Sequence, residues 1–536
     1  RMWLQPLTDI HFTPDFHRGD DGDNQFRKAY LPTIYALMGA ALFILIIAAI
    51  NFINLSTAQS VRRAKETGIR KVLGSKRSSL VFQFLTETFM LTLLAVCISV
   101  SLVRPVLSLF SGYIPAGVAF HLNGSTLIFL GIVTALITLL AGLYPAMVLS
   151  AYLPVQSLKA GGAQRNGEKW YLRKALIIFQ FSISLIFIIA TLIIRNQIRY
   201  MKDSDKGFST DAIVTIPRIW NDPGNRINVL TENIKRIPGV RQVIREAFAP
   251  MGFPHMSGTI EYKDKEDLTL QVSLQPGNEN LIPFYEMKLL AGRNMLPSDS
   301  LKEIVINETC SKSLGFVKPA DALGRQINWW DGKTYPIVGV IADFHENSYH
   351  EPMKPVVIAH IPEQEKGIAI KLTTQHKQAA DAKTILAGIA KQWKKIYPDE
   401  PFKCNFLNES IRWLYDQETK TAWLMMVAMA ITIFISCMGL FGLALFTAEQ
   451  RTREIGIRKV LGASVANIMV LLSKDFVLLV VIALAIASPV AFYFMDQWLQ
   501  DFAYRIHISW WVFILAGFAA ISIALITVSF QAIKAA

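Results

Sequence analysis

Long apolar stretches alternate with polar segments along most of this chain. A helix that crosses the hydrocarbon core of a bilayer needs about 20 mostly apolar residues. Buried helices of a soluble protein are the alternative, but so many blocks of this length exceed what a soluble core contains. The seven predicted membrane spans are residues 33–55, 80–103, 126–149, 174–195, 423–447, 470–495 and 510–531.

The segment 196–420 has a different pattern, with short alternating or β-branched runs between turn signals. Such runs are typical of strands, and Asp331-Gly332 is a hairpin-turn signal. Helical periodicity covers about 224–237 and 376–397. The predicted strands are 212–217, 257–262, 268–274, 303–307 and 335–341. We therefore expect a polytopic α-helical membrane protein with one mixed α/β domain outside the membrane.

Composition agrees with this interpretation. Of 536 residues, 52% are hydrophobic and 18% charged, and the mean hydropathy is +0.34, which excludes a disordered chain and a disulfide-stapled miniprotein. The four cysteines have no metal-binding spacing. Cys97 and Cys437 fall in apolar blocks, so Cys310 and Cys404 are the only pair that the sequence leaves open.

The net charge of +13 suggests either nucleic acid or an anionic membrane surface as a partner. The distribution of Lys and Arg decides between them, because cytoplasmic loops carry the positive excess. Loops 56–79, 150–174 and 448–467 hold sixteen Lys and Arg, whereas the opposite short loops hold only Arg104 and Arg505. The positive net charge is thus explained by the orientation of the chain in the membrane, and no nucleic-acid partner is needed to account for it. It places the three basic loops in the cytoplasm and residues 1–32 and 196–420 outside.

The chain contains an internal repeat at an offset of 388 residues. Residues 63–74 read RAKETGIRKVLG and residues 451–462 read RTREIGIRKVLG, identical at nine of twelve positions. Each copy follows one predicted span and precedes another. Acidic Glu87 and Asp475, also 388 apart, lie near the start of the following spans. Two halves of one architecture are therefore expected.

Each copy of the repeat predicts an amphipathic helix. In the first copy Ile69, Val72 and Leu73 form one apolar stripe, and Arg70 and Lys71 project from the other side. The second copy has the same arrangement. We expect these helices at the inner membrane surface, with the apolar face in lipid or in the bundle and the charges toward the cytoplasm. Binding to anionic lipid would explain the charges alone, whereas a fixed pattern in both halves suggests that each copy docks a protein partner.

The pattern R-x-[KR]-E-x-G-I-R-K-V-L-G after a span resembles the signature of FtsX/MacB-type ABC transporter permeases. Segment 196–420 resembles the MacB-like periplasmic core domain, on the stretches 289–293, 305–308 and 338–345. The resemblance is to the duplicated eight-span form found in Bacteroidetes. Since the chain starts at Arg1 and its first half shows only three spans, we expect a span and most of an outer domain to precede residue 1.

The resemblance implies a domain organisation. Two FtsX-like three-span domains, each with a coupling helix, flank a MacB-like periplasmic domain. The implied boundaries are 1–32 for the tail of a first periplasmic domain or stalk, 33–149 for the first three-span domain with its coupling helix at about 60–78, 150–173 for a cytoplasmic linker, 174–195 for a transmembrane helix, 196–420 for the periplasmic domain, and 421–536 for the second three-span domain with its coupling helix at about 448–466.

The resemblance also implies a function and partners. A separate ABC ATPase dimer would dock on the coupling helices, and its movement would pass through the first two spans of each half to drive export or efflux by mechanotransmission. The implied location is the inner membrane, in contact with lipid, with a periplasmic adaptor or an outer-membrane partner as further candidates. The docking residues carried over are Arg63, Glu66, Gly68, Arg70 and Lys71, with Arg451, Glu454, Gly456, Arg458 and Lys459 in the second half.

Catalytic motifs are absent from the sequence, so we expect no enzyme, cofactor or metal site. The nearest match to a P-loop, residues 162–169, has Glu168 where the phosphate-binding Lys is required. His345 and His350 are five residues apart, whereas a zinc-protease helix needs four. Glu87 and Asp475 could form an intramembrane proton site, although pairing with nearby basic residues or snorkelling explains them more simply.

Two other functions remain open from the sequence. An FtsX-like membrane protein that signals to cell-wall hydrolases, and exports nothing, would have the same features. A membrane-anchored hydrolase with a site near His345 is the second.

Overall fold

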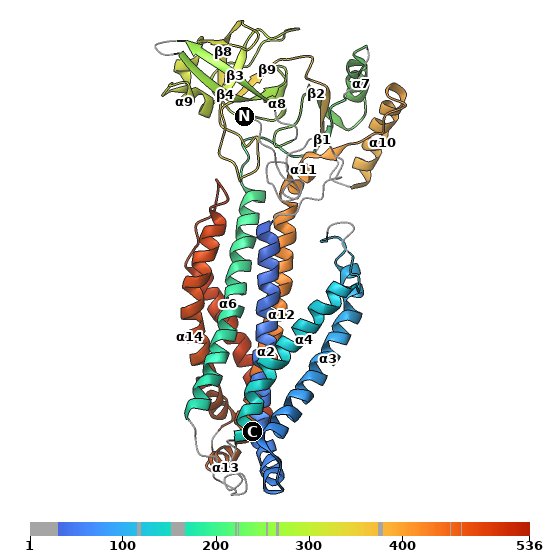
Figure 1. Ribbon diagram of the computed structural model, residues 1–536. Helices are drawn as coiled ribbons and strands as arrows, with labels where there is room; N and C mark the ends of the chain where they lie inside the picture. The colour runs from blue at the N-terminus through green and yellow to red at the C-terminus, as the bar shows by residue number, and fades with distance from the viewer. Residues whose placement is uncertain are drawn as a thin grey trace.

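The computed structural model describes residues 31–114, 119–151, 167–219, 222, 224–252, 256–263, 267–373, 379–450, 452–462 and 464–535. It consists of a bundle of long helices with a smaller body of strands and short helices at one end (Figure 1). The predicted fold class is confirmed, because seven helices are long and apolar enough to cross a membrane. These helices are α2 (Leu31–Val72), α3 (Arg77–Leu109), α4 (Gly124–Ala151), α6 (Gly167–Asp203), α12 (Asp416–Gln450), α14 (Val465–Leu499) and α15 (Trp511–Ala535).

The repeat seen in the sequence is also a repeat of structure. α2 ends at Val72, and α13 (Thr452–Val460), which follows α12, ends 388 residues later at Val460. α3 and α14 begin at Arg77 and Val465, again 388 residues apart. α2, α3 and α4 therefore correspond to α12 with α13, α14 and α15. Residues 1–30, and most of the predicted linker 150–173, lie outside the described part of the chain.

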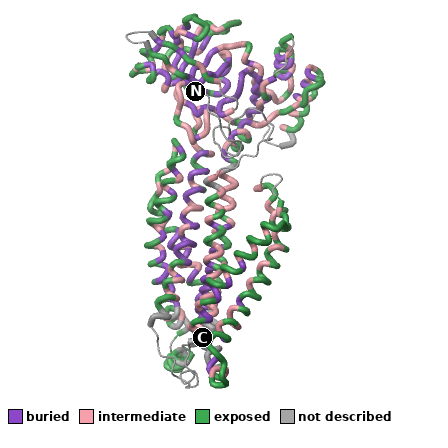
Figure 2. The backbone as a smooth tube through the Cα atoms, in the orientation of Figure 1, coloured by how far each residue is buried: buried purple, intermediate pink, exposed green. Residues whose placement is uncertain are grey.

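α6 is the centre of the second half. It packs against α12, α14 and α15, and 72% of its most apolar stretch is buried, whereas α3 has no buried residue in the corresponding stretch. Figure 2 shows this contrast between the purple core of the bundle and the largely exposed α3–α4 pair. Small polar residues tie α6 to its neighbours: the hydroxyls of Ser184 and Ser436 on α12 are 2.9 Å apart, as is typical of helix interfaces in membranes.

α2 and α12 form the interface between the two halves. The side-chain amide of Asn51 on α2 donates a hydrogen bond to the carbonyl of Ile435 on α12. Gly439 and Gly442 face α2, and a Cβ atom at either position would overlap the side chain of Asn51 or Leu55. Glycine is thus required here so that the two helix backbones can approach closely.

The α/β domain contains two sheets. The four-stranded sheet has the order β11-β1-β10-β2 with antiparallel neighbours, and α7 and α10 pack beside it around one apolar cluster. Its elements are β1 (Ile213–Ile216), β2 (Val240–Glu246), β10 (Gly367–Leu372), β11 (Asn405–Phe406), α7 (Arg226–Lys235) and α10 (Ala379–Ile396). A short helix, α11 (Leu407–Leu414), then leads from this sheet into α12.

The second sheet is mixed and has the order β5-β8-β6-β9-β4-β3-β7. β7 also pairs with the start of β8, so that the sheet curls back on itself. Its elements are β3 (Met256–Lys263), β4 (Asp267–Pro276), β5 (Leu289–Gly292), β6 (Ile304–Asn307), β7 (Gln326–Asn328), β8 (Thr334–Ile341), β9 (Val356–Ala359), α8 (Leu281–Phe284), α9 (Glu308–Ser313) and the 3-10 helix η2 (Pro319–Ala322). The predicted turn at Asp331-Gly332 is confirmed as the connection of the β7–β8 hairpin, with Gly332 at a φ of 78°.

Each strand predicted from the sequence is present, as are the helices predicted near 224–237 and 376–397. Cys310 and Cys404, the only pair that the sequence left open, are both free thiols.

Candidate functional site

The two copies of the repeated motif lie at the end of the bundle away from the α/β domain, on the last turns of α2 and on α13 (Figure 1). In the first half the motif is a direct continuation of the membrane-spanning helix, since α2 is helical without interruption from Leu31 to Val72. The segment expected as the coupling helix, about 60–78, thus comprises the end of α2, the turn that follows it and the first residues of α3. Both copies lie at the same end of the bundle (Figure 1), which agrees with the common side expected from the positive charges in their loops.

The same ion pair stabilises each copy. Glu66 lies 2.8 Å from Arg70, and Glu454 lies 2.8 Å from Arg458, in both cases one helical turn apart. Such i,i+4 pairs stabilise an exposed helix by about 0.3–0.5 kcal/mol. The repeated glutamate thus has a role within its own helix, independent of any partner.

The last residue of the motif ends the helix. Gly74 has a φ of 94° and Gly462 a φ of 87°, a conformation that glycine adopts readily and other residues do not. In the first copy the amide of Ser75 bonds the carbonyl of Arg70, and the amide of Gly74 bonds that of Lys71, which is the Schellman arrangement. The helices end at Val72 and Val460, just before these glycines, and α3 and α14 begin after a short turn. The expected bounds of about 60–78 and 448–466 therefore extend beyond the end of each helix.

We expect Gly462→Ala to loosen α13. Alanine in a left-handed conformation costs about 1–2 kcal/mol, which corresponds to a roughly five- to thirtyfold loss of hydrogen-exchange protection at the end of α13. Gly456→Ala is the matched control, since a Cβ there has no atom within 4 Å and lies in the helix interior, where alanine stabilises a helix by about 0.5–1 kcal/mol. Equal loosening by both variants would contradict a terminating role for Gly462.

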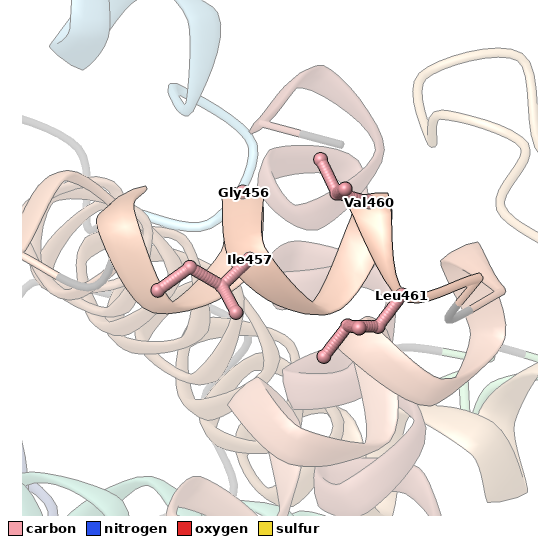
Figure 3. A pocket seen from close by; sticks show the side chains of 4 residues that line it. All are labelled: Gly456, Ile457, Val460 and Leu461. Carbon is pink, nitrogen blue, oxygen red and sulfur yellow. The ribbon is translucent and has the colours of Figure 1, made fainter.

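The apolar stripe of each copy is exposed. Val460 is 88% and Leu461 80% exposed, and with Ile457 and Gly456 they line an open apolar depression on α13 (Figure 3). In the first copy Val72 is 63% and Leu73 80% exposed. The stripe is therefore not packed in the bundle, one of the two places expected for it, because the helix ends extend beyond the neighbouring spans.

The basic side chains of the first copy, by contrast, are held by the protein itself. Arg70 donates to the side chain of Gln83 at 2.7 Å, and Gln83 in turn donates to Glu87 at 3.3 Å. Lys71 donates to the backbone carbonyl of Ser150 at the end of α4 at 2.6 Å. These contacts fix the end of α2 against α3 and α4 and leave the apolar stripe as the surface that faces outward.

The remaining candidate residues are placed as follows. Gly68 is buried in α2 and Lys459 is exposed on α13. Arg63 lies in α2, but its side chain and the whole of Arg451 are outside the described residues. Glu87 and Asp475 are exposed on α3 and α14 and do not point into the bundle core.

The structure places His345 and His350 against aromatic rings. The ring of His345 stacks on Tyr349 and that of His350 on Phe502. Within the described part of the chain, no three His, Cys, Asp or Glu side chains are grouped so that they could hold a metal ion.

The exposed position of the apolar stripe differs from the packing against lipid or the bundle that its apolar character suggested. The available signal was the identity of Ile, Val and Leu at the same three positions in both copies. A stripe that only faces lipid requires apolar character and not the same three side chains.

Two family models match the chain. The FtsX-like permease C-terminal model matches residues 38–154 and again 426–536, which are the two halves of the repeat. The MacB-like periplasmic core domain model matches residues 175–387.

Similar proteins include two ATP-binding/permease proteins named for macrolide export, both MacB. The protein from Neisseria gonorrhoeae is 23% identical over 316 residues, 56% of this chain and 46% of that protein. The protein from Haemophilus ducreyi is 29% identical over 157 residues, 28% of this chain and 22% of that protein. The chain thus spans less than half the length of these relatives.

Two solved structures are similar to the part outside the membrane. The periplasmic region of MacB from Actinobacillus actinomycetemcomitans matches with a TM-score of 0.28 and 14% identity, over 39% of this chain and 95% of that chain. The extracellular domain of the ABC-type transporter YknZ from Gram-positive bacteria matches with a TM-score of 0.25 and 13% identity, over 35% of this chain and 96% of that chain.

Proposed function

Because the chain belongs to the FtsX/MacB type of ABC transporter permeases, we propose that it is a membrane subunit through which a separate ABC ATPase moves an extracytoplasmic domain. The observation that carries the proposal is the pair of equivalent helix ends, each with an exposed apolar stripe, at the end of the bundle away from the α/β domain. Two equivalent surfaces suit a partner that is itself a symmetric dimer.

The proposed docking surface consists of the apolar stripe of the motif and the charged residues beside it. The stripe of Ile457, Val460 and Leu461 would fill an apolar groove of the ATPase, and its counterpart in α2 would fill the groove of the second ATPase subunit. The flanking basic residues would orient each helix end: Arg63, Arg70 and Lys71 in one half, and Arg451, Arg458 and Lys459 in the other. Glu66 and Glu454 would stabilise their own helices through the i,i+4 pairs. Gly456, which is exposed on α13, would allow close approach of the ATPase backbone, whereas its counterpart Gly68 is buried in α2.

The direction of transmission is supported by the covalent path. From the docking ends, α2 and α12 run the length of the bundle, and α12 leads through α11 into the α/β domain. The ends of α6 and α12 near that domain are also joined, since Lys202 donates to the hydroxyl of Thr419 at 3.2 Å. Nucleotide-driven closure of the ATPase would thus displace the α/β domain and, in the inner membrane, move cargo on the outer side.

The test is reconstitution of the chain in lipid nanodiscs with a purified ABC ATPase encoded beside it. We expect nucleotide-dependent change in a distance between spin labels on the α/β domain at Val317 and on the membrane bundle at Leu109, which are 87% and 75% exposed. The ATPase must be required for the change. A stable complex whose distances are the same with ATP and with ADP would contradict the proposal.

A further inference from the structure

Three segments that are far apart in the sequence meet at the outer end of α6. They are the loop 500–510 between α14 and α15, here called the outer loop, the segment 345–353 of the α/β domain, and the start of α12. The side-chain amide of Gln197 on α6 is fully buried and bonds the outer loop twice. It donates to the carbonyl of Tyr504 and accepts from the amide of Ile506, both at 2.9 Å. The outer loop is thereby clamped to α6.

Tyr504 bonds the α/β domain from the other side of the same loop. Its backbone amide donates to the carbonyl of Tyr349 at 3.2 Å, and its hydroxyl accepts from the amide of Met353 at 3.1 Å. The ring of His345 lies edge-on to the Tyr504 ring, with centroids 4.9 Å apart. The outer loop is thus bonded both to α6 and to the α/β domain, independently of the covalent links through α6 and α12.

His350 joins all three segments. Its Nε2 lies 3.0 Å from a carboxylate oxygen of Glu418 on α12, and its Nδ1 lies 3.2 Å from the carbonyl of Asp501 in the outer loop. Its ring stacks on Phe502 with centroids 4.2 Å apart. Both ring nitrogens face acceptors, and only the imidazolium form donates from both nitrogens. The geometry therefore favours charged His350.

The charged groups around His350 agree with this. Burial alone would lower the pKa of His350, but the hydrogen bond and the charge of Glu418, with a smaller contribution from Asp501, raise it. Glu351 and Lys354 on the same segment pair with each other at 2.6 Å. The other histidine of the segment behaves oppositely: burial, and then the charge of Lys206, lower the pKa of His345 to about 4, so it stays neutral.

We propose that the outer loop is a joint that transmits displacement of α14 to the α/β domain, and that His350 is a positioning residue that holds this joint more tightly in acid than in alkali. The inference rests on the proposed function. α14 begins five residues after α13 ends and leads directly into the outer loop. At 1.5 Å per residue its 35 residues span about 50 Å, which makes it a third route from the docking end, besides α2 and α12.

The sign of the pH effect follows from the raised pKa. The contribution of charged His350 is fully present below the ordinary histidine pKa and is lost as the pH rises through the higher value of the folded protein. Hydrogen exchange of residues 345–353 and 500–510, corrected for intrinsic rates, tests this on the full chain in nanodiscs without ATPase. We expect at least about threefold more protection at about pH 5.5 than at about pH 8.5.

Two variants give the test its specificity. His350→Gln should abolish the pH difference, whereas His507→Gln, at an exposed histidine of the same loop, should preserve it. A wild-type protein without the difference, or a His350→Gln variant that retains it, would overturn the role of His350.

The transmission itself is tested with the ATPase complex and the labels at Val317 and Leu109, after replacement of Cys97, Cys404 and Cys437 by serine. Tyr504→Ala should leave ATPase capture unchanged and reduce the nucleotide-dependent distance change by at least about half. Tyr493→Ala, at an exposed tyrosine of α14, is the control and should show the same distance change as the wild type. If the nucleotide-dependent distance change in Tyr504→Ala equals that of the wild type, the role of the outer loop as a joint is refuted. If the wild type itself shows no distance change, the proposed function fails instead.

Discussion

Replacing Val460 by aspartate is expected to weaken capture of the ABC ATPase by at least about tenfold, and the double variant Val72→Asp/Val460→Asp by at least about a hundredfold. Both valines are at the centre of the exposed apolar stripes, and Val460 is the most exposed of its copy. Burial of an aliphatic side chain of this size contributes about 1.5–3 kcal/mol, and every 1.4 kcal/mol is a factor of ten in affinity.

The substitution should act through the interface and not through the fold. Val460 packs against no described core residue, so aspartate at this position should leave the fold of the permease unchanged. The free energy of ATPase binding should become less favourable, because docking must transfer an unpaired carboxylate into an apolar groove. The measurement is the affinity of the solubilised permease for the purified ATPase, with the unfolding midpoint as a check that the fold is unchanged.

Glu454→Gln is the matched control for this prediction. The Glu454–Arg458 pair is half-exposed and internal to α13, so its loss should change the affinity by less than about twofold. If Glu454→Gln weakened capture as much as Val460→Asp, recognition would depend on the charges, and the apolar stripe would not be the docking surface.

The position of the spans and of the repeat could be predicted because both are local features of the sequence. Seven long apolar blocks and an identical twelve-residue pattern need no knowledge of distant contacts. Strands with clear alternation, such as 257–262 and 268–274, were predicted for the same reason. β9, at 356–359, is not among the predicted strands. All four of its residues are buried, and a short continuous apolar run has no period that identifies it as a strand.

The role of the histidines could not be predicted from their spacing. His345 and His350 belong to one short segment, yet the groups that set them apart lie at least 68 residues away in the sequence. They are Glu418 on α12, and Asp501 and Tyr504 in the outer loop. Likewise, the sequence shows Glu66 and Arg70 one turn apart, but the contacts of Lys71 with Ser150 depend on how α2 packs against α4. Spacing within a segment predicts local pairs, whereas tertiary packing decides which surface remains free.

The second large effect is expected at the interface between the halves, where Gly439→Leu/Gly442→Leu should force α2 and α12 apart. Side chains at these positions would overlap Asn51 and Leu55, and Asn51 is held by its hydrogen bond to Ile435. Overpacking costs about 1–3 kcal/mol per site, so the double variant should lose roughly 2–6 kcal/mol and unfold at a clearly lower temperature or denaturant concentration. Gly131→Leu on α4 is the control, since a Cβ there has no atom within 4 Å.

The Gly439→Leu/Gly442→Leu variant also tests whether the spacing of the two motif copies matters for docking, independently of their side chains. α2 and α12 each lead into one of the two motif copies, so moving them apart changes the spacing of two surfaces whose side chains are intact. A dimeric ATPase gains affinity by engaging both at once, and this gain is lost when the geometry forbids simultaneous contact. In nanodiscs at a temperature where the variant is folded, we expect the ATPase affinity to fall toward that of Val460→Asp, which retains one stripe. Wild-type affinity in a folded Gly439→Leu/Gly442→Leu protein would show that one helix end suffices for capture.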